Sequence, residues 1–373
     1  MTYLKVFAIA FAASAVLLFA LGCQPKVFSS ESPANAGVPT AETTPKNKEP
    51  ITIAAVGDVM LGSTSINDSY FPPNDGADIL KEVTPELSKA DITFGNLEGP
   101  MLEGGSSSKC PPHSTRCFAF RVPTRYGRYL KDAGFDVMSL ANNHAGDFGD
   151  YGRASTRKTL DELGIKYAGS DKENYSTTYL EVKGKRVAFV GFAHNNLVPN
   201  VNDLDSARRL VSEARKHADL VVVSFHGGGE GTDHQHVINQ TEVFAGEARG
   251  NLPAFAHTVI DAGADLVLGH GPHVMRGLEI YKDHLICYSL GNFATYGMFS
   301  LRAETAISEI LEIKLGADGK FVSGKIVPVK QEGRGGPKLD PSNAAIRVVR
   351  NLSLADFGVN AAKIADDGTV TPK

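Results

Sequence analysis

The stretch Gly263-Ala264-Asp265-Leu266-Val267-Leu268-Gly269-His270-Gly271-Pro272-His273 decides how we interpret the rest of this chain. An apolar run rich in branched residues and bounded by glycines is typical of a central strand that is buried on both faces. Gly271 and Pro272 oppose a regular helix after this strand, so we expect His270 and His273 on irregular backbone at its end. Imidazole is the most common metal ligand in proteins, and α/β folds place their sites in such loops. An ordinary pair of loop histidines is the alternative.

The same pattern of a strand ending on a polar side chain recurs elsewhere, which favours a site over the alternative. The residues that end these other predicted strands are Asp58, Asn96 with Glu98, Asn143 with His144, and His226. Each of them alone could be a turn former or a cap. Parallel strands, however, bring their carboxyl ends to one edge of a sheet. Carboxylate, amide and imidazole groups together suit one or two divalent ions such as Mn, Zn, Mg or Fe.

Strands and helices alternate up to His273, which predicts a layered α/β domain with largely parallel sheets. The predicted strands cover residues 51–56, 91–94, 136–141, 185–192 and 219–225, and the predicted helices cover 79–89, 124–133, 150–163 and 203–217, with an interrupted helical region ending at 261. Two later hairpins, 278–290 and 305–329, predict an antiparallel sheet that finishes the domain. A terminal helix over 341–355 and a frayed end complete the prediction.

The N-terminus is predicted to be a targeting segment. Residues 6–21 are uncharged and almost wholly apolar, yet the run is shorter than the ~20 residues of a spanning helix. Ala20-Leu21-Gly22-Cys23 resembles the lipobox of bacterial lipoproteins, which implies a signal peptide over 1–22 and lipidation of Cys23. Ala20 stands where leucine is usual, so plain cleavage or an uncleaved anchor stays open. Residues 23–50 are rich in Pro, Ser, Thr and Lys and predict a disordered tether to the membrane.

Export changes the interpretation of the cysteines. Cys110 and Cys117 bracket a short loop, and in an oxidising compartment they are a plausible disulfide. As metal ligands they would need partners of their own kind, which are not nearby in the sequence. Cys287 lies in an apolar run and is predicted to be a buried small hydrophobe.

The charge of the chain bears on its partners. The formal net charge of the 373 residues is −4 and no long basic block is present, so nucleic acid is not indicated. An acidic polymer or a phosphorylated substrate would therefore need a local positive site, such as metal ions or a few arginines.

Six motifs, in order, resemble those of the bacterial capsule synthesis proteins of the CapA/PgsA type. That family is tied to poly-γ-glutamate capsule production, and its fold resembles the calcineurin-like metallophosphoesterases. The motifs are Gly57-Asp58-Val59-Met60-Leu61-Gly62, Gly95-Asn96-Leu97-Glu98, Ala141-Asn142-Asn143-His144, the strand ending in His226, Gly269-His270-Gly271-Pro272-His273, and Tyr288-Ser289-Leu290-Gly291-Asn292-Phe293. The resemblance covers about residues 51–300.

The resemblance implies a four-layer α-β-β-α sandwich over 51–300. A hairpin over 301–340 would complete the second sheet, and 341–373 would form a short helix and a frayed tail. By the same resemblance, the first metal would be held by Asp58 and His273, the second by Asn143, His226 and His270, and Glu98 would bridge the two.

The resemblance also implies a catalytic role for His144, which would protonate the leaving group. Met60 is a departure from the metallophosphoesterase pattern, since a histidine is common two residues after the first aspartate. A thioether is a poor ligand for a hard ion, so the first metal site could be weak or empty.

Three further residues are candidates for binding substrate or supporting the ligands: Asn96, Arg249 and Asn292. Arg249 could hold an anionic group in bidentate fashion, with a surface salt bridge as its ordinary role. Asn292 follows a strand and could orient a ligand.

Two classes of function remain open. The first is a metal-dependent hydrolase that acts on a phosphoester or on an amide of polyglutamate. The second is a non-catalytic factor that binds or assembles a surface polymer. Either protein would be exported and lipid-anchored on the periplasmic or cell-surface side, with capsule synthesis membrane proteins as partners.

Overall fold

The computed structural model describes residues 49–63, 70–110, 117–297 and 299–372, all within one compact unit. The predicted signal peptide, the lipidation site Cys23 and the tether up to residue 48 lie outside the described residues. Across the described part of the chain, no helix combines the length and the apolar composition that crossing a bilayer requires.

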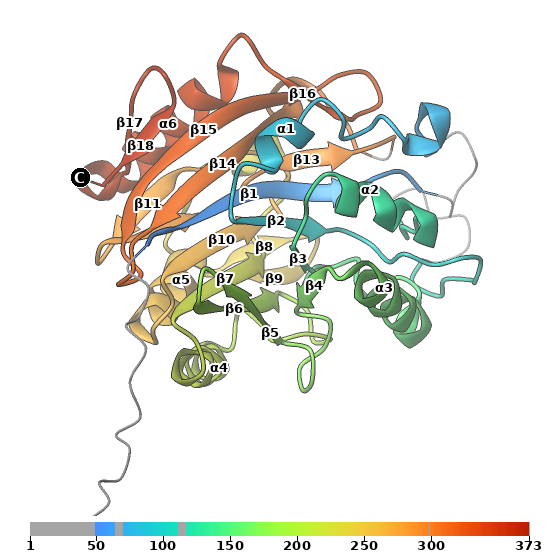
Figure 1. Cartoon of the computed structure of the whole chain (residues 1–373), viewed down its shortest axis with the longest axis horizontal. Helices are drawn as coiled ribbons and strands as arrows, with labels where there is room; N and C mark the ends of the chain where they lie inside the picture. The colour runs from blue at the N-terminus through green and yellow to red at the C-terminus, as the bar shows by residue number, and fades with distance from the viewer. Residues whose placement is uncertain (1–48, 64–69, 111–116, 298, 373) are drawn as a thin grey trace, which may run out of the picture. The chain divides into compact units, whose positions relative to one another are not determined.

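The larger of two main sheets is built around β1, which runs through its centre (Figure 1). Its strand order is β17-β18-β15-β14-β1-β2-β3-β4, with β13 beside β1 and β16 beside β15. The strands β1 to β4 and β13 are parallel, whereas β14 to β18 pair antiparallel. The ten strands are β1 (Ile51–Met60), β2 (Ile92–Leu97), β3 (Val137–Ser139), β4 (Lys166–Ala168), β13 (Asn292–Thr295), β14 (Ile307–Leu315), β15 (Phe321–Gln331), β16 (Pro337–Leu339), β17 (Lys363–Ile364) and β18 (Thr369–Thr371).

The second main sheet has the order β11-β12-β10-β7-β6-β5. Its central strands β6, β7, β10 and β12 are parallel, and β5 and β11 close its edges in antiparallel fashion. The strands are β5 (Thr177–Val182), β6 (Lys185–Ala193), β7 (Leu220–His226), β10 (Leu266–His270), β11 (Leu278–Tyr281) and β12 (His284–Cys287). A separate hairpin of β8 (Glu242–Phe244) and β9 (Glu247–Gly250) lies between β7 and β10 in the chain.

The α-helices are α1 (Thr84–Leu87), α2 (Gly127–Asp132), α3 (Gly149–Leu163), α4 (Leu204–Lys216), α5 (Leu252–Asp261) and α6 (Ala344–Phe357). The helices α1 to α3 cover the outer face of the larger sheet, and α4 and α5 cover that of the second sheet, whereas α6 packs against the space between the sheets. Short 3₁₀ helices cover Pro73–Gly76, Thr124–Tyr126, Thr232–His234, Ala303–Ala306 and Gly358–Asn360. Local capping sets several of the ends: Asp203 accepts from the amide of Ser206 at the start of α4, and Gly164 ends α3 in the left-handed conformation.

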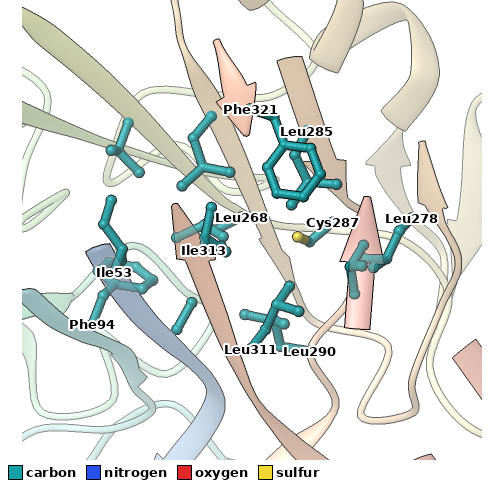
Figure 2. Close-up of a cluster of buried hydrophobic side chains, with 14 of the residues drawn as sticks. Ile53, Phe94, Leu268, Leu278, Leu285, Cys287, Leu290, Leu311, Ile313 and Phe321 are labelled. Atoms are coloured by element: carbon teal, nitrogen blue, oxygen red, sulfur yellow. The ribbon is translucent and has the colours of Figure 1, made fainter. Parts of the chain in front are cut away.

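Three hydrophobic clusters show the layers. One fills the space between the sheets, one lies between the larger sheet and α1 to α3, and one lies under α4 and α5. Alternation along each strand divides the side chains, so Ile53 of β1 faces the cluster between the sheets while Val56 faces the outer cluster. Figure 2 shows the cluster between the sheets, where Ile53 and Phe94 lie opposite Leu268. The predicted four-layer α-β-β-α sandwich is therefore confirmed.

Two predicted helices differ from the structure. Of residues 79–89 only α1 is an α-helix, because Pro85 lacks an amide hydrogen and fits only the first turn. The helical region predicted before Asp261 contains the β8–β9 hairpin, and only α5 is helical. Ala245 and Gly246 both have positive φ, which suits a tight hairpin turn and opposes a helix.

The C-terminal region also differs from the prediction. The hairpin of β14 and β15 pairs with β1 and so extends the larger sheet; the prediction that it completes the second sheet is wrong. The prediction of a frayed tail is also wrong, since β17 and β18 pair with each other and β18 pairs with β15. Ile364 and Val370 belong to the cluster between the sheets, so apolar burial holds this end of the chain.

Glu309 is an unusual buried carboxyl group within β14. Its side chain is fully buried, and both of its oxygens lack a hydrogen-bond partner in the described part of the chain. Burial raises the pKa of Glu309 to about 8. The carboxyl also lies near the buried Cys287, where burial and the charge of Glu309 raise the pKa of the thiol.

The cluster between the sheets should dominate stability. Leu268 is fully buried there, so Leu268→Ala should lower the free energy of unfolding by about 2–5 kcal/mol, through lost burial and a cavity. Val322→Ala, at a position 46% exposed on β15, should change it by less than about 0.5 kcal/mol. Urea unfolding of both variants measures the difference, and equal losses would contradict the layered core.

Glu309 should make stability fall as the pH rises. The pKa is about 4.5 in the unfolded chain and about 8 in the folded protein, so only the folded state holds this proton between these values. At pH 7 the loss amounts to roughly 3 kcal/mol relative to pH 4. Glu309→Gln, which stays neutral, should remove this part of the pH dependence in urea unfolding at pH 5 and pH 8. An unchanged difference between the two pH values would show that Glu309 is ionised in the folded protein.

Candidate metal centre

The register of the parallel strands brings the predicted residues together at one edge. In the larger sheet Asp58 of β1 lies beside Asn96 of β2 and Asn292 of β13. In the second sheet His226 of β7 lies beside His270 of β10. Contacts between side chains of the two sheets then join these strand ends into one cluster.

Asp58, Glu98 and His273 form the centre of this cluster. Each offers a ligand atom, and these atoms lie within 4.8 Å of one another. His273 Nδ1 is 2.9 Å from Asp58 Oδ2, and its Nε2 is 3.7 Å from Glu98 Oε1. His270 Nδ1 lies 3.4 Å from the other oxygen of Asp58. Burial to 9% exposure or less excludes bulk water from all four side chains.

The electrostatics of the centre follow from placing two carboxylates and several imidazoles in a dry site. Burial opposes ionisation of Asp58, but His270 and His273 outweigh it and hold the pKa of Asp58 below its usual value. Burial and the charge of Asp58 raise the pKa of Glu98 well above its usual value. Burial lowers the pKa of His273, but Glu98 and Asp58 overcome this effect and raise it to about 10. A proton on Glu98 or a bound cation would therefore relieve the repulsion between the two carboxylates.

Several buried polar atoms in the cluster have no hydrogen-bond partner in the described part of the chain. They are both carboxylate oxygens of Glu98, Oδ1 of Asn143, Nε2 of His226 and both ring nitrogens of His270. Burying such atoms without a partner costs about 1–3 kcal/mol each, so native proteins rarely leave them unpaired. Oxygen and imidazole nitrogen donors of this kind suit a divalent cation. Burial also lowers the pKa of His226 well below its usual value, and the neutral form is the one that binds a metal.

Met60 occupies the last position of β1, two residues after Asp58. Its side chain is buried at 1% exposure, and its main-chain oxygen accepts from the amide of Tyr296. A thioether adds no oxygen or nitrogen donor beside Asp58, so the donors there are fewer than those around His226 and His270.

Three asparagines support the centre. Asn96 Nδ2 donates to Asp58 Oδ1 at 2.8 Å, and Asn142 Nδ2 donates to Asn96 Oδ1 at 3.1 Å and to the oxygen of Leu97 at 2.9 Å. Asn292 Nδ2 donates to the main-chain oxygen of His273 at 3.1 Å. These bonds hold Asp58 and His273 in orientation, as partners of metal ligands usually do.

His144 lies beside the centre with its own set of partners. Its Nδ1 is 2.7 Å from Asp147 Oδ2, and the Phe120 ring stacks on the imidazole at 4.0 Å between centroids. Lys109 Nζ is 3.1 Å from the same Nδ1. Burial lowers the pKa of His144, although Asp147 acts in the opposite direction. Asp147 therefore holds Nδ1, and Nε2 is the nitrogen left for exchange of a proton with a substrate.

The loops after β7 and β10 pack backbone against backbone, and glycines make this possible. Gly227 donates to the oxygen of His270, and Gly231 donates to the oxygen of Pro272. A Cβ at Gly271 would lie 2.6 Å from the oxygen of Gly227, and the φ of Gly271 is +115°. Only glycine therefore allows His270 and His273 to be presented beside His226.

A buried ion pair between Arg276 and Glu242 stabilises the loop after β7. Arg276 is fully buried and donates from both Nη atoms to Glu242 at 2.8 Å. Glu242 also accepts from the amide of Gly229 at 2.8 Å, and Arg276 Nε donates to the oxygen of His234. Removing either partner would leave a buried charge unpaired, so this pair holds the loop in one conformation.

Arg249 does not join the cluster. It is buried at 3% exposure, and its Nη1 and Nη2 pair with Glu230 at 2.8 Å and Glu247 at 2.9 Å. Both ends of the guanidinium are therefore occupied, and it presents no open bidentate face to an anionic substrate. The structure therefore places Arg249 in a salt bridge with a partly exposed partner, Glu247, and the candidate role in substrate binding stays a prediction.

Several residues of the site were not singled out from the sequence: Lys109, Phe120, Asn142, Asp147 and Arg276. His144 and Asp147 have the spacing of a short turn, which is the one local signal that could have pointed to Asp147. Lys109 and Phe120 flank the cysteine pair Cys110 and Cys117, which are joined by a disulfide with Cα atoms 5.4 Å apart. Nothing in the local sequence connects that loop to His144.

Comparisons with known proteins found several that are similar to this chain. Over 268 residues the chain is 30% identical to the capsule biosynthesis protein CapA of Bacillus anthracis, which covers 66% of this chain and 60% of that protein. It is 28% identical over 349 residues to the PGA biosynthesis protein CapA of Bacillus subtilis, with 88% and 84% of the two chains covered. The structure also resembles the NAD nucleotidase of Haemophilus influenzae at 10% identity and a TM-score of 0.39, covering 80% of this chain and 55% of the other.

The family described as bacterial capsule synthesis protein PGA_cap matches residues 52–296. This range includes both main sheets up to β13 and every residue of the candidate metal centre. The chain therefore belongs to the bacterial capsule synthesis protein family PGA_cap.

Proposed function

We propose that this protein is a metal-dependent hydrolase that acts during production of an acidic capsule polymer such as poly-γ-glutamate. The observation that carries the proposal is a set of buried atoms that have no hydrogen-bond partner in the described part of the chain and lie at the edge shared by both sheets. They are both carboxylate oxygens of Glu98, Nε2 of His226 and both ring nitrogens of His270. Such a set is costly in a protein that binds nothing there, whereas a bound divalent cation would satisfy it.

The residues divide into ligands and supports. Asp58, Glu98 and His273 would hold one ion, and Glu98 with Asn143, His226 and His270 would hold a second. When bound, such ions lower the pKa of a water molecule and stabilise the oxygens of the bond under attack. Asn96 orients Asp58, and Asn292 holds the backbone at His273.

His144 would act as the acid for the leaving group. Because Nδ1 faces Asp147 at 2.7 Å, the proton to be donated would be carried on Nε2. Phe120 covers one face of the ring and shields it from water. The carboxylate of Asp147 stabilises the imidazole in this orientation without taking part in bond making.

The substrate class follows from the family and from the charges around the site. The relatives named above are capsule and PGA biosynthesis proteins, so an acidic polymer, or a phosphorylated precursor of it, fits this chain. Metal ions would supply the positive charge, since Arg249 and Lys109 are already paired with carboxylates. The bond cleaved would be a phosphoester or an amide of polyglutamate.

Met60 favours a second candidate, a non-catalytic factor that binds or assembles the surface polymer. Because no nitrogen or oxygen donor stands at that position, the ion held by Asp58 would be bound weakly. A protein with one occupied site could retain binding while lacking vigorous hydrolysis.

We also place the protein outside the cytoplasm, anchored through Cys23 and working with membrane proteins of capsule synthesis. The capsule family and the disulfide between Cys110 and Cys117 support this location, since disulfides persist in oxidising compartments. Nucleic acid is not a proposed partner.

Glu98 should be required for metal binding. Glu98→Gln removes the charge that both ions share, and should weaken Mn²⁺ binding about 100-fold or more, as measured by titration calorimetry on the metal-free protein. Glu162→Gln, at an exposed carboxylate on α3, is the control and should bind Mn²⁺ as the wild type does. Equal affinities for the two variants would exclude the proposed centre.

His144 should be required for turnover but not for metal binding. With Mn²⁺ present, His144→Ala should slow hydrolysis of a phenyl phosphodiester by about 10²–10⁴-fold, because general acid catalysis is lost. His217→Ala, an exposed histidine at the end of α4, is the matched control.

The same variant separates the two candidate functions. If the deletion strain regains normal capsule when it produces His144→Ala, the hydrolase is ruled out and the binding or assembly factor remains.

A further inference from the structure

The disulfide lies next to the residues that surround His144. Lys109 directly precedes Cys110, and Phe120 lies three positions after Cys117. Cys117 Sγ also contacts the main-chain oxygen of Lys109 at 3.9 Å. The covalent bond therefore keeps the two ends of this loop together at the point where Lys109 and Phe120 meet Asp147.

Asp147 receives a contact from each end of the loop. Lys109 Nζ lies 2.5 Å from Asp147 Oδ1, and the amide of Phe120 donates to Oδ2 at 2.7 Å. His144 Nδ1 shares Oδ2 with Phe120, at 2.7 Å. Ser107 Oγ donates to the main-chain oxygen of Asp147 and accepts from the amide of Lys109. The carboxylate is fully buried, so these donors replace the water that it has lost.

Lys109 is held much more firmly than an ordinary surface lysine. Its Nζ contacts Asp147, the ring of His144 and the main-chain oxygen of Asn143, the last at 3.3 Å. The ammonium group pairs with the buried carboxylate of Asp147, and charge-assisted hydrogen bonds of this kind are strong. Its side chain is 31% exposed, so the pair lies at the rim of the site.

We propose that Lys109 is a positioning residue and that the Cys110–Cys117 disulfide, by holding Lys109 and Phe120 on either side of Asp147, orients His144 for its work as the acid. The proposal rests on the hydrolase function proposed above and adds to it a covalent requirement that the metal ligands do not share. A dithiol reductant would convert the disulfide into two thiols and become oxidised itself, and the two ends of the loop would then separate. Metal binding would continue, because none of the ligands proposed above lies between Lys109 and Phe120.

The test compares three forms of the protein with one control. The forms are Lys109→Met, the double variant Cys110→Ser/Cys117→Ser, and wild type reduced with dithiothreitol. Lys320→Met removes a lysine that pairs with Asp283 on an exposed hairpin, and serves as the matched control. Thermal unfolding first establishes that each form is folded, and hydrogen exchange, Mn²⁺ titration and hydrolysis are then measured on the same samples.

If Lys109 and the disulfide orient His144, the amide hydrogens of Phe120 and His144 should exchange with solvent about tenfold faster in all three forms, because their partners are no longer held. Mn²⁺ affinity should stay within about twofold of wild type. Hydrolysis of a phenyl phosphodiester should fall about tenfold, while a 4-nitrophenyl diester, whose leaving group needs little protonation, should change less than about twofold. Lys320→Met should resemble wild type in all three measurements.

The outcomes separate this proposal from the proposed function. Unchanged exchange at Phe120 and His144, or an equal loss with both esters, would overturn the positioning role. If wild type hydrolyses neither ester with any metal, the hydrolase is wrong, and the exchange rates still decide whether Lys109 and the disulfide hold His144.

Discussion

The candidate site depends on one electrostatic constraint, which is that Asp58 and Glu98 are buried side by side. Burial and the repulsion between these two carboxylates raise the pKa of Glu98, so a proton or another positive charge is needed to offset the repulsion. His273 supplies part of it by contacting both residues. Nε2 of His226 and both ring nitrogens of His270 have no hydrogen-bond partner in the described part of the chain and could bind a cation. The strands, glycine loops and asparagines around the centre hold these groups where a cation can complete them.

The fold meets this constraint by bringing two sheets to a common edge. Parallel strands in each sheet end at the same level, so β1 and β2 deliver carboxylates from one side while β7 and β10 deliver imidazoles from the other. Backbone contact between the two imidazole loops is possible only because Gly271 lacks a side chain. The buried pair of Arg276 and Glu242 then fixes one of these loops. The groups that could bind a metal therefore lie at or just after the ends of strands that are buried along their length.

Two of the residues around His144 come from a part of the chain that supplies none of the candidate metal ligands. His144 belongs to the sandwich, but Lys109 and Phe120 come from a loop that a disulfide closes. Because the candidate metal ligands lie outside this loop, the groups around His144 can change without changing those ligands. Met60 adds no oxygen or nitrogen donor beside Asp58.

Much of this was already determined by the sequence. Apolar strands ending in Asp58, Glu98, Asn143, His226 and His270 predicted the sandwich and the residues that meet at its edge, because parallel strands must bring their carboxyl ends together. The tertiary structure alone decided the rest. The β14–β15 hairpin joined the larger sheet because its apolar face fitted beside β1, and the end of the chain was held by the burial of Ile364 and Val370. Lys109, Phe120 and Asp147 met at His144, and Arg249 was paired, through contacts between segments distant in the chain. Local patterns record which face of a segment is buried, whereas partners of a polar side chain depend on where other segments pack, so only the folded structure could reveal them.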